Sequence, residues 1–411
     1  MVNILRHYEH KNEKIEVSYF DLRAVYFRGL KEEGRACYEL FDLENSINVR
    51  LSYFIGLDWI NKENAIHVSP KLDSTTQKID YLKMLSSCLF HPDILDETED
   101  LYHIDFSKPS ISIEQALDQL TPLLIVHFLQ VMRLLVKKSL KKGYYRVEEN
   151  LISKVKGKIV TAKNFKTNIV KNRQLKTVCN FQEFGIDTYE NRLLKKTLRF
   201  VLRYVSNQES LKKSSSETLR FCLAPFDQVN ENIETHELKY IHINPIYKEY
   251  TSAIRLAKLI LQRFGFNMHA ADKNEKVSTP PFWIDMSRLF ELYVLGKLKD
   301  RFKHQVKYHF RKRWNELDYL IDAPDLQMIA DAKYKKKYET TYSIDDIRQL
   351  SGYARIKEIA KELKVSDEKM IDCLIIYPDQ NASDKLKENL KSEEIPGFTR
   401  FYKTPIALPV V

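Results

Sequence analysis

Two strand-like runs in the last third of the chain are joined by a short turn, and this pairing constrains the fold more than any other local feature. The runs are 316–321 and 327–334, and the turn between them is Asp322-Ala-Pro-Asp325. Proline fixes one backbone dihedral angle and aspartate tolerates turn conformations, so the segment is typical of a β-hairpin. The two runs are therefore expected to be neighbouring antiparallel strands.

The position of the turn decides which residues face each other. If it is centred between Pro324 and Asp325, paired residue numbers sum to 649, which places Asp318 opposite Asp331. Directly opposite side chains share a face, with Cβ atoms about 5 Å apart. Lys333 lies two residues further along and shares that face. With a different register, Asp325 would compete with Asp318 for this position.

Two facing carboxylates repel each other unless a cation lies between them, so Asp318 and Asp331 predict a divalent-metal site. Mg²⁺ is held by few protein oxygens and suits such a pair. The metal would act as a Lewis acid on a phosphodiester oxygen and lower the pKa of a bound water. Lys333 would orient or deprotonate that water and stabilise the charge that develops on phosphorus. The alternative is an exposed hairpin with cross-strand Asp–Lys pairs, because Asp-X-Lys is frequent by chance.

A carboxylate on the preceding helix, expected over 285–302, is a candidate third metal ligand. Glu291 has apolar neighbours at helical spacing, so its charge needs either a partner or a function. An ion pair with a Lys or Arg at the helix surface is the alternative. A later helix, expected over 344–363, carries Gln349 and Tyr353 one turn apart. Gln349 would orient a ligand or phosphate, and Tyr353 would pack beside it.

The surrounding pattern predicts the fold class. Strands at 370–377 and 398–402 follow the helices, so the C-terminal region is expected to be an α/β layer with a mixed sheet. Residues 1–105 alternate strand-like runs with turns, 113–142 form a long apolar helix, and 146–265 look mostly helical. A chain of 411 residues is expected to hold two or three domains. We divide it into 1–145, 146–275 and 276–411, an α+β or α/β multidomain protein.

Charge and cysteine usage limit the class of protein. The net charge is +10, and the segment 137–176 holds 13 Lys and Arg against 2 Asp and Glu. This local basic excess suits a polyanion, although a solvated lysine-rich face is the alternative. The five cysteines form no CxxC pair, so they are expected to be small buried hydrophobes. Apolar runs are too short or too interrupted for a membrane span or signal peptide, which predicts a soluble cytoplasmic protein.

The ordered set of Glu291, Asp318 and Asp331-Ala-Lys333 resembles the PD-(D/E)xK nuclease core. Leu317 stands where the family pattern has proline before the first aspartate. A wider likeness to the McrC family, the nuclease subunit of the McrBC modified-cytosine restriction system, is strongest over 286–353. It rests on the following segments: Met286-Ser-Arg-Leu-Phe-Glu-Leu-Tyr-Val294, the hairpin, Asp331-Ala-Lys-Tyr-Lys335, the Gln349–Tyr353 helix, and upstream Ile66-His-Val-Ser-Pro-Lys71, Gly157-Lys-Ile and Asp187-Thr-Tyr-Glu-Asn-Arg-Leu-Leu-Lys195.

This resemblance implies a Mg²⁺-dependent DNA endonuclease that works with McrB, a GTP-hydrolysing AAA+ motor. The motor recognises modified DNA and translocates, and residues 1–145 would contact it. Asp318, Asp331 and Glu291 would hold the metal, with Lys333 and Gln349 completing the catalytic set. Basic residues near the hairpin are expected to contact the DNA backbone: Lys335, Lys336, Lys337, Arg311 and Arg313. The alternatives are a non-catalytic DNA-binding adaptor that activates the motor, with a decayed nuclease fold, and an RNA-cutting enzyme acting alone.

Overall fold

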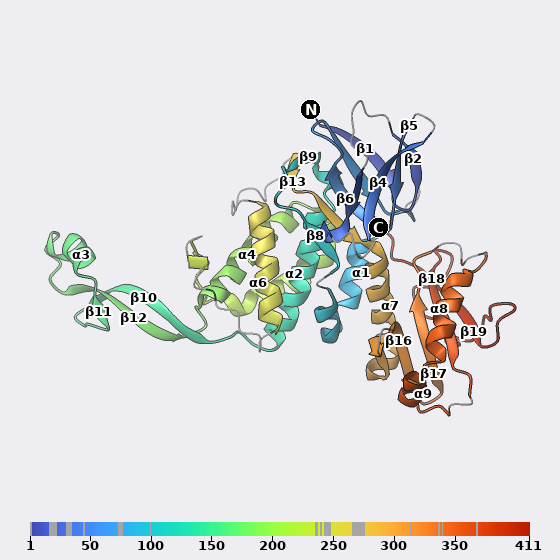
Figure 1. Ribbon diagram of the computed structural model, residues 1–411. Helices are drawn as coiled ribbons and strands as arrows, with labels where there is room; N and C mark the ends of the chain where they lie inside the picture. Colours follow the sequence, from blue (N-terminus) through green and yellow to red (C-terminus); the bar gives the residue numbers. More distant parts are fainter. Residues whose placement is uncertain are drawn as a thin grey trace. The chain divides into compact units, whose positions relative to one another are not determined.

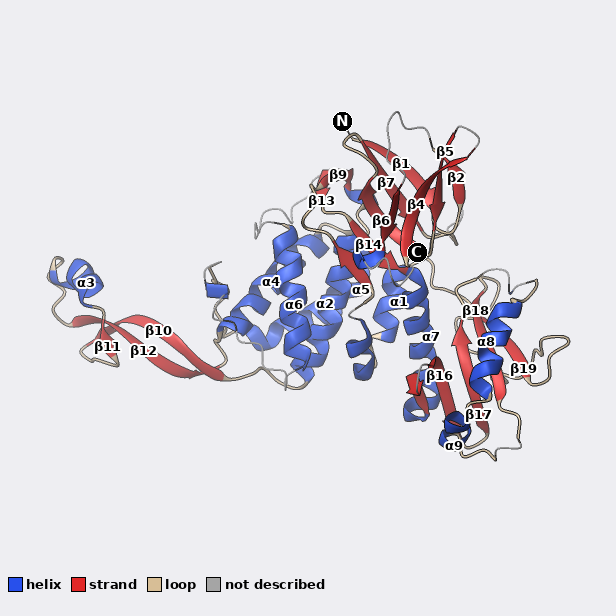
Figure 2. Cartoon of the chain, in the orientation of Figure 1, coloured by secondary structure: helices blue, strands red, loops and turns tan. Residues whose placement is uncertain are grey.

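The computed structural model describes most of the chain and divides it into two compact units (Figure 1). One unit joins Met1–Leu123 to Glu275–Val411, and the other is Leu124–Asn274. The described residues are 2–15, 23–29, 35–43, 46–72, 77–98, 100–234, 237–238, 241, 248–264, 276–312, 315–335, 338, 340–366 and 369–411. Helices and several separate sheets are present, so the chain is a mixed α/β multidomain protein, as expected (Figure 2).

The N-terminal β region of the first unit contains three sheets. A five-stranded sheet has the order β1 (Asn3–Tyr8), β7 (Asn64–Ser69), β6 (Phe54–Trp59), β14 (Phe282–Asp285) and β8 (Tyr102–Ile104). A four-stranded sheet has the order β2 (Asn12–Lys14), β5 (Ser46–Leu51), β4 (Ala36–Leu43) and β3 (Arg23–Tyr26). The third pairs β13 (Lys276–Thr279) with β9 (Ile111–Glu114). The β-rich prediction for this region is confirmed.

Two helices connect this region to the C-terminal part of the same unit. Helix α7 (Met286–Phe302) packs against α1 (Tyr81–Cys88), and a Cβ on Gly296 would lie 2.9 Å from the Cα atom of Cys88. Asp285 caps α7, because its side chain accepts a hydrogen bond from the N–H of Arg288 at 3.0 Å. Short 3₁₀ turns complete the unit: η1 (Phe27–Gly29), η3 (Pro92–Thr98), η4 (Gln115–Leu117) and η9 (Lys303–Gln305).

The C-terminal α/β region is a five-stranded mixed sheet covered by two helices. The strand order is β15 (Val306–Lys312), β16 (Asn315–Ala323), β17 (Leu326–Ala332), β18 (Asp372–Pro378) and β19 (Phe401–Ile406). The first three strands are antiparallel, and β17, β18 and β19 run parallel. Helices α8 (Ile344–Ala354) and α9 (Lys357–Glu362) pack on the sheet through a shared apolar core, and the helix expected over 344–363 is thus two helices.

The second unit is built on helices. They are α4 (Tyr189–Ser206), which packs against α5 (Glu209–Leu223) and α6 (Lys248–Arg263), the turn η6 (Ala224–Phe226), and α2 (Leu120–Lys137), which begins in the first unit. The mostly helical character expected for 146–265 is confirmed in this part of the segment, where α4 and α6 lie. By length and composition α2 could cross a membrane, but 72% of it is buried inside the protein, and buried core helices meet the same criterion.

The helical prediction for 146–265 is wrong over the first forty residues, which form a β-arm. Strand β10 (Gly143–Ile152) pairs along its whole length with β12 (Lys176–Gly185), and β11 (Lys158–Ile159) adds to β12. The far end carries α3 (Thr161–Asn164) and the π-helical turn η5 (Phe165–Ile169). In Figure 1 the arm extends away from the helices of its unit. Most side chains of the arm are at least partly exposed to solvent. Backbone pairing of its strands, rather than a large apolar core, therefore holds the arm together.

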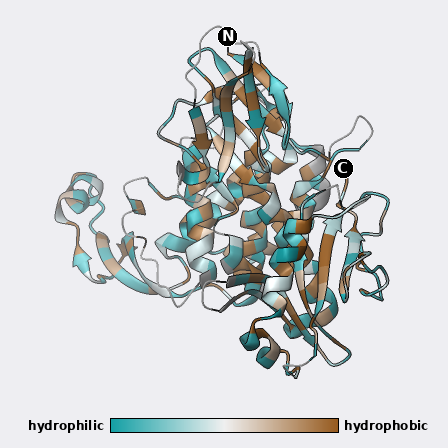
Figure 3. Cartoon of the chain, turned by 45° about the vertical axis from the view of Figure 1, so that its right-hand side comes forward, coloured by the Kyte–Doolittle hydropathy of each residue, from teal (hydrophilic) through white to brown (hydrophobic). Residues whose placement is uncertain are grey.

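The arm carries exposed apolar side chains as well as the lysines that make this segment basic. Figure 3 shows hydrophilic and hydrophobic stretches alternating along it. Exposed apolar residues include Tyr144, Phe165, Val170, Leu175 and Phe184. Contact with a polyanion stays a prediction for this segment.

The three predicted segments do not coincide with the compact units. Residues 276–411 and the N-terminal residues belong to one unit, because β14 pairs with β6 and β8 inside the N-terminal sheet. The assignment of motor contact to 1–145 stays a prediction. All five cysteines are buried and free of disulfides, which confirms their expected role as small buried side chains.

Candidate functional site

The β16–β17 hairpin has the register that its turn predicts. Five successive residue pairs across it have numbers that sum to 649. The next position along each strand belongs to Asp318 on β16 and Asp331 on β17. The Asp318 Oδ2 atom accepts a hydrogen bond from the N–H of Ala332 at 3.0 Å, which ties its side chain to β17. Asp325 is exposed in the turn, so it does not take the place of Asp318.

The two carboxyl groups form a buried acidic pair. Asp331 is 4% exposed, and its side chain lies within hydrogen-bonding reach of Asp318. Burial raises the pKa of Asp318 well above its usual value, and the neighbouring Asp331 raises it further. An acidic pair of this kind holds a proton or a cation between its oxygens, because two bare carboxylates at this distance repel.

Lys333 completes the pair as a permanent cation. Its Nζ atom lies 2.6 Å from the Asp331 Oδ2 atom. Burial lowers the pKa of Lys333, but the adjacent Asp331 outweighs that effect and raises it to about 12. A lysine that stays protonated donates hydrogen bonds and stabilises negative charge. The environment therefore favours the orienting and charge-stabilising role of Lys333 over that of a proton acceptor.

Helix α8 extends the group toward solvent. Lys333 Nζ donates to Gln349 Oε1 at 3.3 Å, and Gln349 Nε2 donates to the hydroxyl of Tyr353 at 3.1 Å. Gln349 is exposed, whereas Asp331 is buried. The chain of contacts thus runs from the buried carboxyl pair to the surface. The structure brings together Asp318, Asp331, Lys333 and Gln349, as the sequence predicts.

Glu291 is close to this group but is held by other residues. Its Oε2 atom lies 3.4 Å from Arg288 Nη1 and accepts a hydrogen bond from the Tyr308 hydroxyl at 3.4 Å. Burial raises the pKa of Glu291 to about 7, against the opposing effect of Arg288. Among the residues that the structure describes, no three His, Cys, Asp or Glu side chains are grouped to hold a metal. The arrangement matches the alternative of a Glu–Arg ion pair, next to the acidic pair.

The residues that hold Glu291 were not predicted from the sequence. Arg288 also contacts Glu97, with its Nη2 atom 3.2 Å from a carboxylate oxygen, and its Nη1 atom lies 2.6 Å from His309 Nε2. The spacing of Arg288 three residues before Glu291 on one helix was a usable signal. Tyr308 and His309 come from β15, and their position depends on strand pairing that the sequence does not reveal.

The predicted DNA contacts are described only in part. The Nζ atom of Lys335 lies 2.8 Å from both carboxylate oxygens of Asp346, so this lysine fixes α8 to the end of β17. Lys336, Lys337 and Arg313 lie outside the described residues, as does the side chain of Arg311. DNA contact by these five residues stays a prediction.

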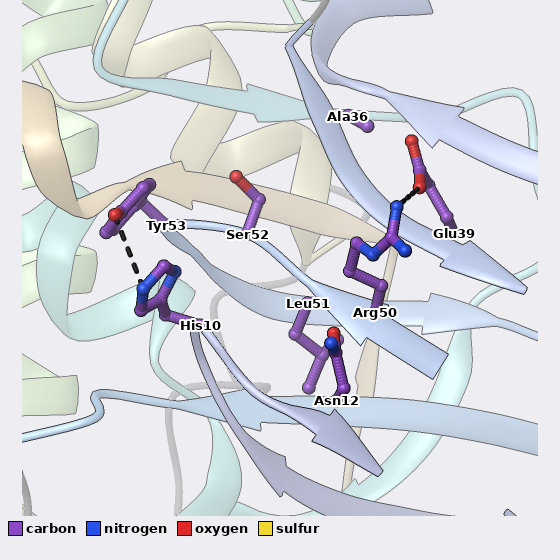
Figure 4. Close-up of a pocket in the computed structure, with 8 residues that line it drawn as sticks. All are labelled: His10, Asn12, Ala36, Glu39, Arg50, Leu51, Ser52 and Tyr53. Carbon is purple, nitrogen blue, oxygen red and sulfur yellow. Dashed lines mark hydrogen bonds and ion pairs between the residues drawn. The ribbon is translucent and has the colours of Figure 1, made fainter. Parts of the chain in front are cut away.

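A separate cavity of about 480 Å³ lies in the N-terminal β region. Figure 4 shows His10 and Tyr53 on one side of it and the ion pair of Arg50 with Glu39 on the other. His10 and Tyr53 stack with ring centroids 4.5 Å apart. The cavity lacks facing carboxylates, so its lining does not reproduce the chemistry of the acidic pair.

The family model described as the McrBC 5-methylcytosine restriction system component matches residues 49–378. The chain belongs to this family. The match begins within the N-terminal β region, after strand β4, and includes the hairpin with the acidic pair, so McrBC membership applies to most of the chain. The resemblance to McrC proposed from the sequence is thereby confirmed at the level of the family.

Two solved structures of McrBC proteins from Thermococcus gammatolerans are similar to this chain. One is a half-complex from a tetradecameric assembly of McrB AAA+ hexamers with bound McrC, with 15% identity over 98% of this chain and 94% of that chain and a TM-score of 0.43. The other is the cryo-EM structure of the McrBC complex, with 15% identity over 74% of this chain and 90% of that chain and a TM-score of 0.31. The comparison with curated proteins gives no match.

Proposed function

We propose that this McrBC-family chain is a Mg²⁺-dependent DNA endonuclease subunit that acts in the cytoplasm as part of a restriction system. The observation that carries the proposal is the buried pair of Asp318 and Asp331 with the Lys333 ammonium 2.6 Å from Asp331. Asp331 is buried and Asp318 and Lys333 are half-buried on neighbouring strands, and such a costly grouping of charged side chains is typical of functional sites. Membership of the McrBC restriction-system family indicates that the reaction served by this site is the cleavage of DNA in restriction.

The acidic pair fits magnesium by its chemistry. Mg²⁺ prefers oxygen ligands, usually needs one or two carboxylates, and keeps several waters. Asp318 and Asp331 would hold the ion, and Glu291 would assist if it were released from Arg288. When bound, the ion supplies Lewis acidity at a phosphodiester oxygen and a more acidic water.

The remaining groups place and stabilise the DNA phosphate. Lys333, held protonated by Asp331, donates hydrogen bonds to a water or to a phosphate oxygen and offsets the negative charge that develops there. Gln349 lies at the exposed end of the chain of contacts, where it meets a phosphate that arrives from solvent. The proposed metal ligands lie at the buried end of this chain of contacts, and Gln349 lies toward solvent. This arrangement suits a substrate that approaches from the α8 side.

We propose an AAA+ GTPase motor of the McrB class as the partner. Membership of the McrBC restriction-system family supports that choice. The partner would recognise modified DNA, and residues 1–145 would contact it. A nuclease that depends on a motor needs no nucleotide site of its own.

The replacement Asp331→Ala tests the proposal. The variant and the wild type are co-purified with the native motor and assayed for DNA cleavage with GTP and Mg²⁺. We expect cleavage to be lost while stimulation of GTP hydrolysis is kept. Asp325→Ala, an exposed aspartate in the same hairpin, is the matched control and should cleave normally. A non-catalytic adaptor would show no difference between wild type and Asp331→Ala in any of these activities, and an RNA-cutting enzyme would cleave labelled RNA without the motor.

A further inference from the structure

The segment that follows strand β17 is fixed by three different elements. The N–H of Lys333 donates to the Ile376 carbonyl of β18 at 2.9 Å. Lys335 is ion-paired with Asp346 of α8. Between them, Tyr334 is 3% exposed and is held by two residues of the N-terminal β region, more than 260 positions earlier in the chain. The backbone on both sides of the Lys333 side chain is therefore anchored.

Glu9 and Lys71 contact Tyr334 at both its side chain and its backbone. The Tyr334 hydroxyl donates to Glu9 Oε1 at 2.8 Å, and Lys71 Nζ donates to the Tyr334 carbonyl at 2.8 Å. The N–H of Lys71 also donates to Glu9 Oε1, at 3.1 Å. We call these three residues the Tyr334 junction. Its bonds close a ring of contacts that fixes the side chain of Tyr334 and the peptide unit between Tyr334 and Lys335.

Aromatic contacts add to the junction. Lys71 Nζ lies 3.7 Å from the ring centroid of Tyr334 and 4.3 Å from that of Tyr53. An ammonium group close to two aromatic rings is attracted to their electron-rich faces. Tyr334 also contacts Phe290, which precedes Glu291 on α7, with ring centroids 5.6 Å apart.

Burying Glu9 here, beside the half-buried Lys71, is costly for the fold alone. Glu9 is 0% exposed, and a carboxyl in that position is tolerated only through its hydrogen bonds and its lysine partner. An apolar pair would join the two regions with less desolvation. The polar pair instead gives directional hydrogen bonds, and these fix the orientation of a peptide unit as well as its position.

We propose that Glu9 and Lys71 are positioning residues that hold Lys333 in its catalytic orientation through Tyr334, so that the N-terminal β region controls the nuclease site. This inference rests on the proposed endonuclease function. A change in the N-terminal β region that shifts Lys71 moves the Tyr334 carbonyl, and Lys333 then loses its alignment with Asp331. Misplacement of a reacting group by about 1 Å costs about a hundredfold in rate.

The test replaces Lys71 in the full chain assembled with its motor. Lys71→Met keeps the length of the side chain and removes its hydrogen-bond donor, and we expect the cleavage rate at saturating DNA to fall about 10- to 100-fold with little change in KM. Lys71→Arg, which keeps the donor and the charge, should restore the rate to within about threefold of wild type. Lys276→Met, at an exposed lysine of β13 in the same β region and outside the proposed motor-contact segment, is the matched control and should match wild type.

A double-variant comparison separates positioning from general stability. In a Lys333→Arg background, Lys71→Met should cause a much smaller further loss, because its effect passes through Lys333. Hydrogen exchange measured without metal gives a second readout: the peptide that contains 331–335 should exchange faster in Lys71→Met and be unchanged in Lys276→Met. If Lys71→Met fails to fold, Tyr334→Phe, which removes only the hydroxyl bond to Glu9, provides the same measurements with a smaller expected loss.

The outcomes distinguish this inference from the function on which it rests. Equal cleavage by wild type and Lys71→Met, or losses that multiply fully with Lys333→Arg, would overturn the positioning role while the nuclease proposal stands. Absence of cleavage by the wild-type assembly would overturn both. Cleavage that depends on Lys71 only through Lys333 would support both.

Discussion

Asp318 on strand β16 accepts a hydrogen bond from the backbone N–H of Ala332 on strand β17, at 3.0 Å. This bond holds the carboxyl group of Asp318 against that of Asp331, although their charges repel. The acidic pair is thus assembled before any metal arrives. Its repulsion destabilises the metal-free fold, and a bound cation relieves it.

Asp318→Asn should therefore stabilise the protein in the absence of metal. The amide oxygen still accepts the bond from Ala332, and the repulsion with Asp331 disappears. We expect a gain on the order of 1 kcal/mol in the free energy of unfolding, since one pKa unit corresponds to about 1.4 kcal/mol. Thermal unfolding in EDTA at pH 8 measures this gain. Mg²⁺ should stabilise the wild type and leave the variant unchanged, and a variant that is destabilised in EDTA would contradict the idea of a repulsive pair.

Magnesium affinity should rise with pH. The raised pKa of Asp318 means that a proton occupies the pair at low pH, and the metal must displace it. Below that pKa, the affinity should increase by up to about tenfold for each pH unit, with one proton released per ion. Calorimetric titration of the full chain with Mg²⁺ in buffers of different ionisation enthalpy measures both quantities. Affinity that does not vary with pH would mean that the proton and the metal do not share the site.

Glu9→Gln should change how stability depends on pH. Burial raises the pKa of Glu9 from 4.5 to about 7, although Lys71 opposes the shift. The folded protein keeps a proton that the unfolded chain releases between these values, so wild-type stability falls as pH rises through this range, by up to about 3 kcal/mol. The glutamine variant has no such titration. Compared with wild type, it should become more stable between pH 4 and pH 8, as urea unfolding at several pH values would show, and parallel curves would refute the assignment.

Two glycines in helices should respond to alanine in opposite directions. Gly296→Ala places a Cβ atom 2.9 Å from the Cα atom of Cys88, so α7 and α1 must separate, at a cost of about 1–3 kcal/mol. Gly352→Ala in α8 meets nothing within 4 Å and should gain up to about 1 kcal/mol from higher helix propensity. Both changes add the same methyl group to a helix. Differential scanning calorimetry of the two variants compares them directly, and equal shifts would show that α1 and α7 pack less closely.

The acidic pair could be predicted because its geometry is local in sequence. The turn around Pro324 and Asp325 fixes the register, and the register alone places Asp318 beside Asp331. Helix α7 was predictable for a similar reason, since its cap Asp285 and its apolar run are contiguous. In each case the interacting residues lie within about twenty positions of each other in the chain, so turn-forming residues and apolar periodicity are enough to predict the structure.

Features that depend on distant partners were missed or mispredicted. The arm was included in a segment expected to be mostly helical, whereas the structure pairs β10 with β12 across more than twenty intervening residues. The hydrogen bond from Tyr308 to Glu291 was missed, because Tyr308 comes from a strand whose position depends on the whole sheet. The Tyr334 junction could not be predicted from the sequence either. Glu9 and Lys71 contact Tyr334 only when the N-terminal β region packs against the C-terminal α/β region.

Strand β14 occupies an interior position in the N-terminal sheet, between β6 and β8, although it immediately precedes the helix that carries Glu291. If residues 276–411 were produced alone as a DNA-cleaving domain, β14 would be separated from β6 and β8. The unpaired strand edges exposed in this way promote aggregation. Protein engineers who wish to transplant this domain onto another targeting scaffold would therefore have to carry the N-terminal sheet with it.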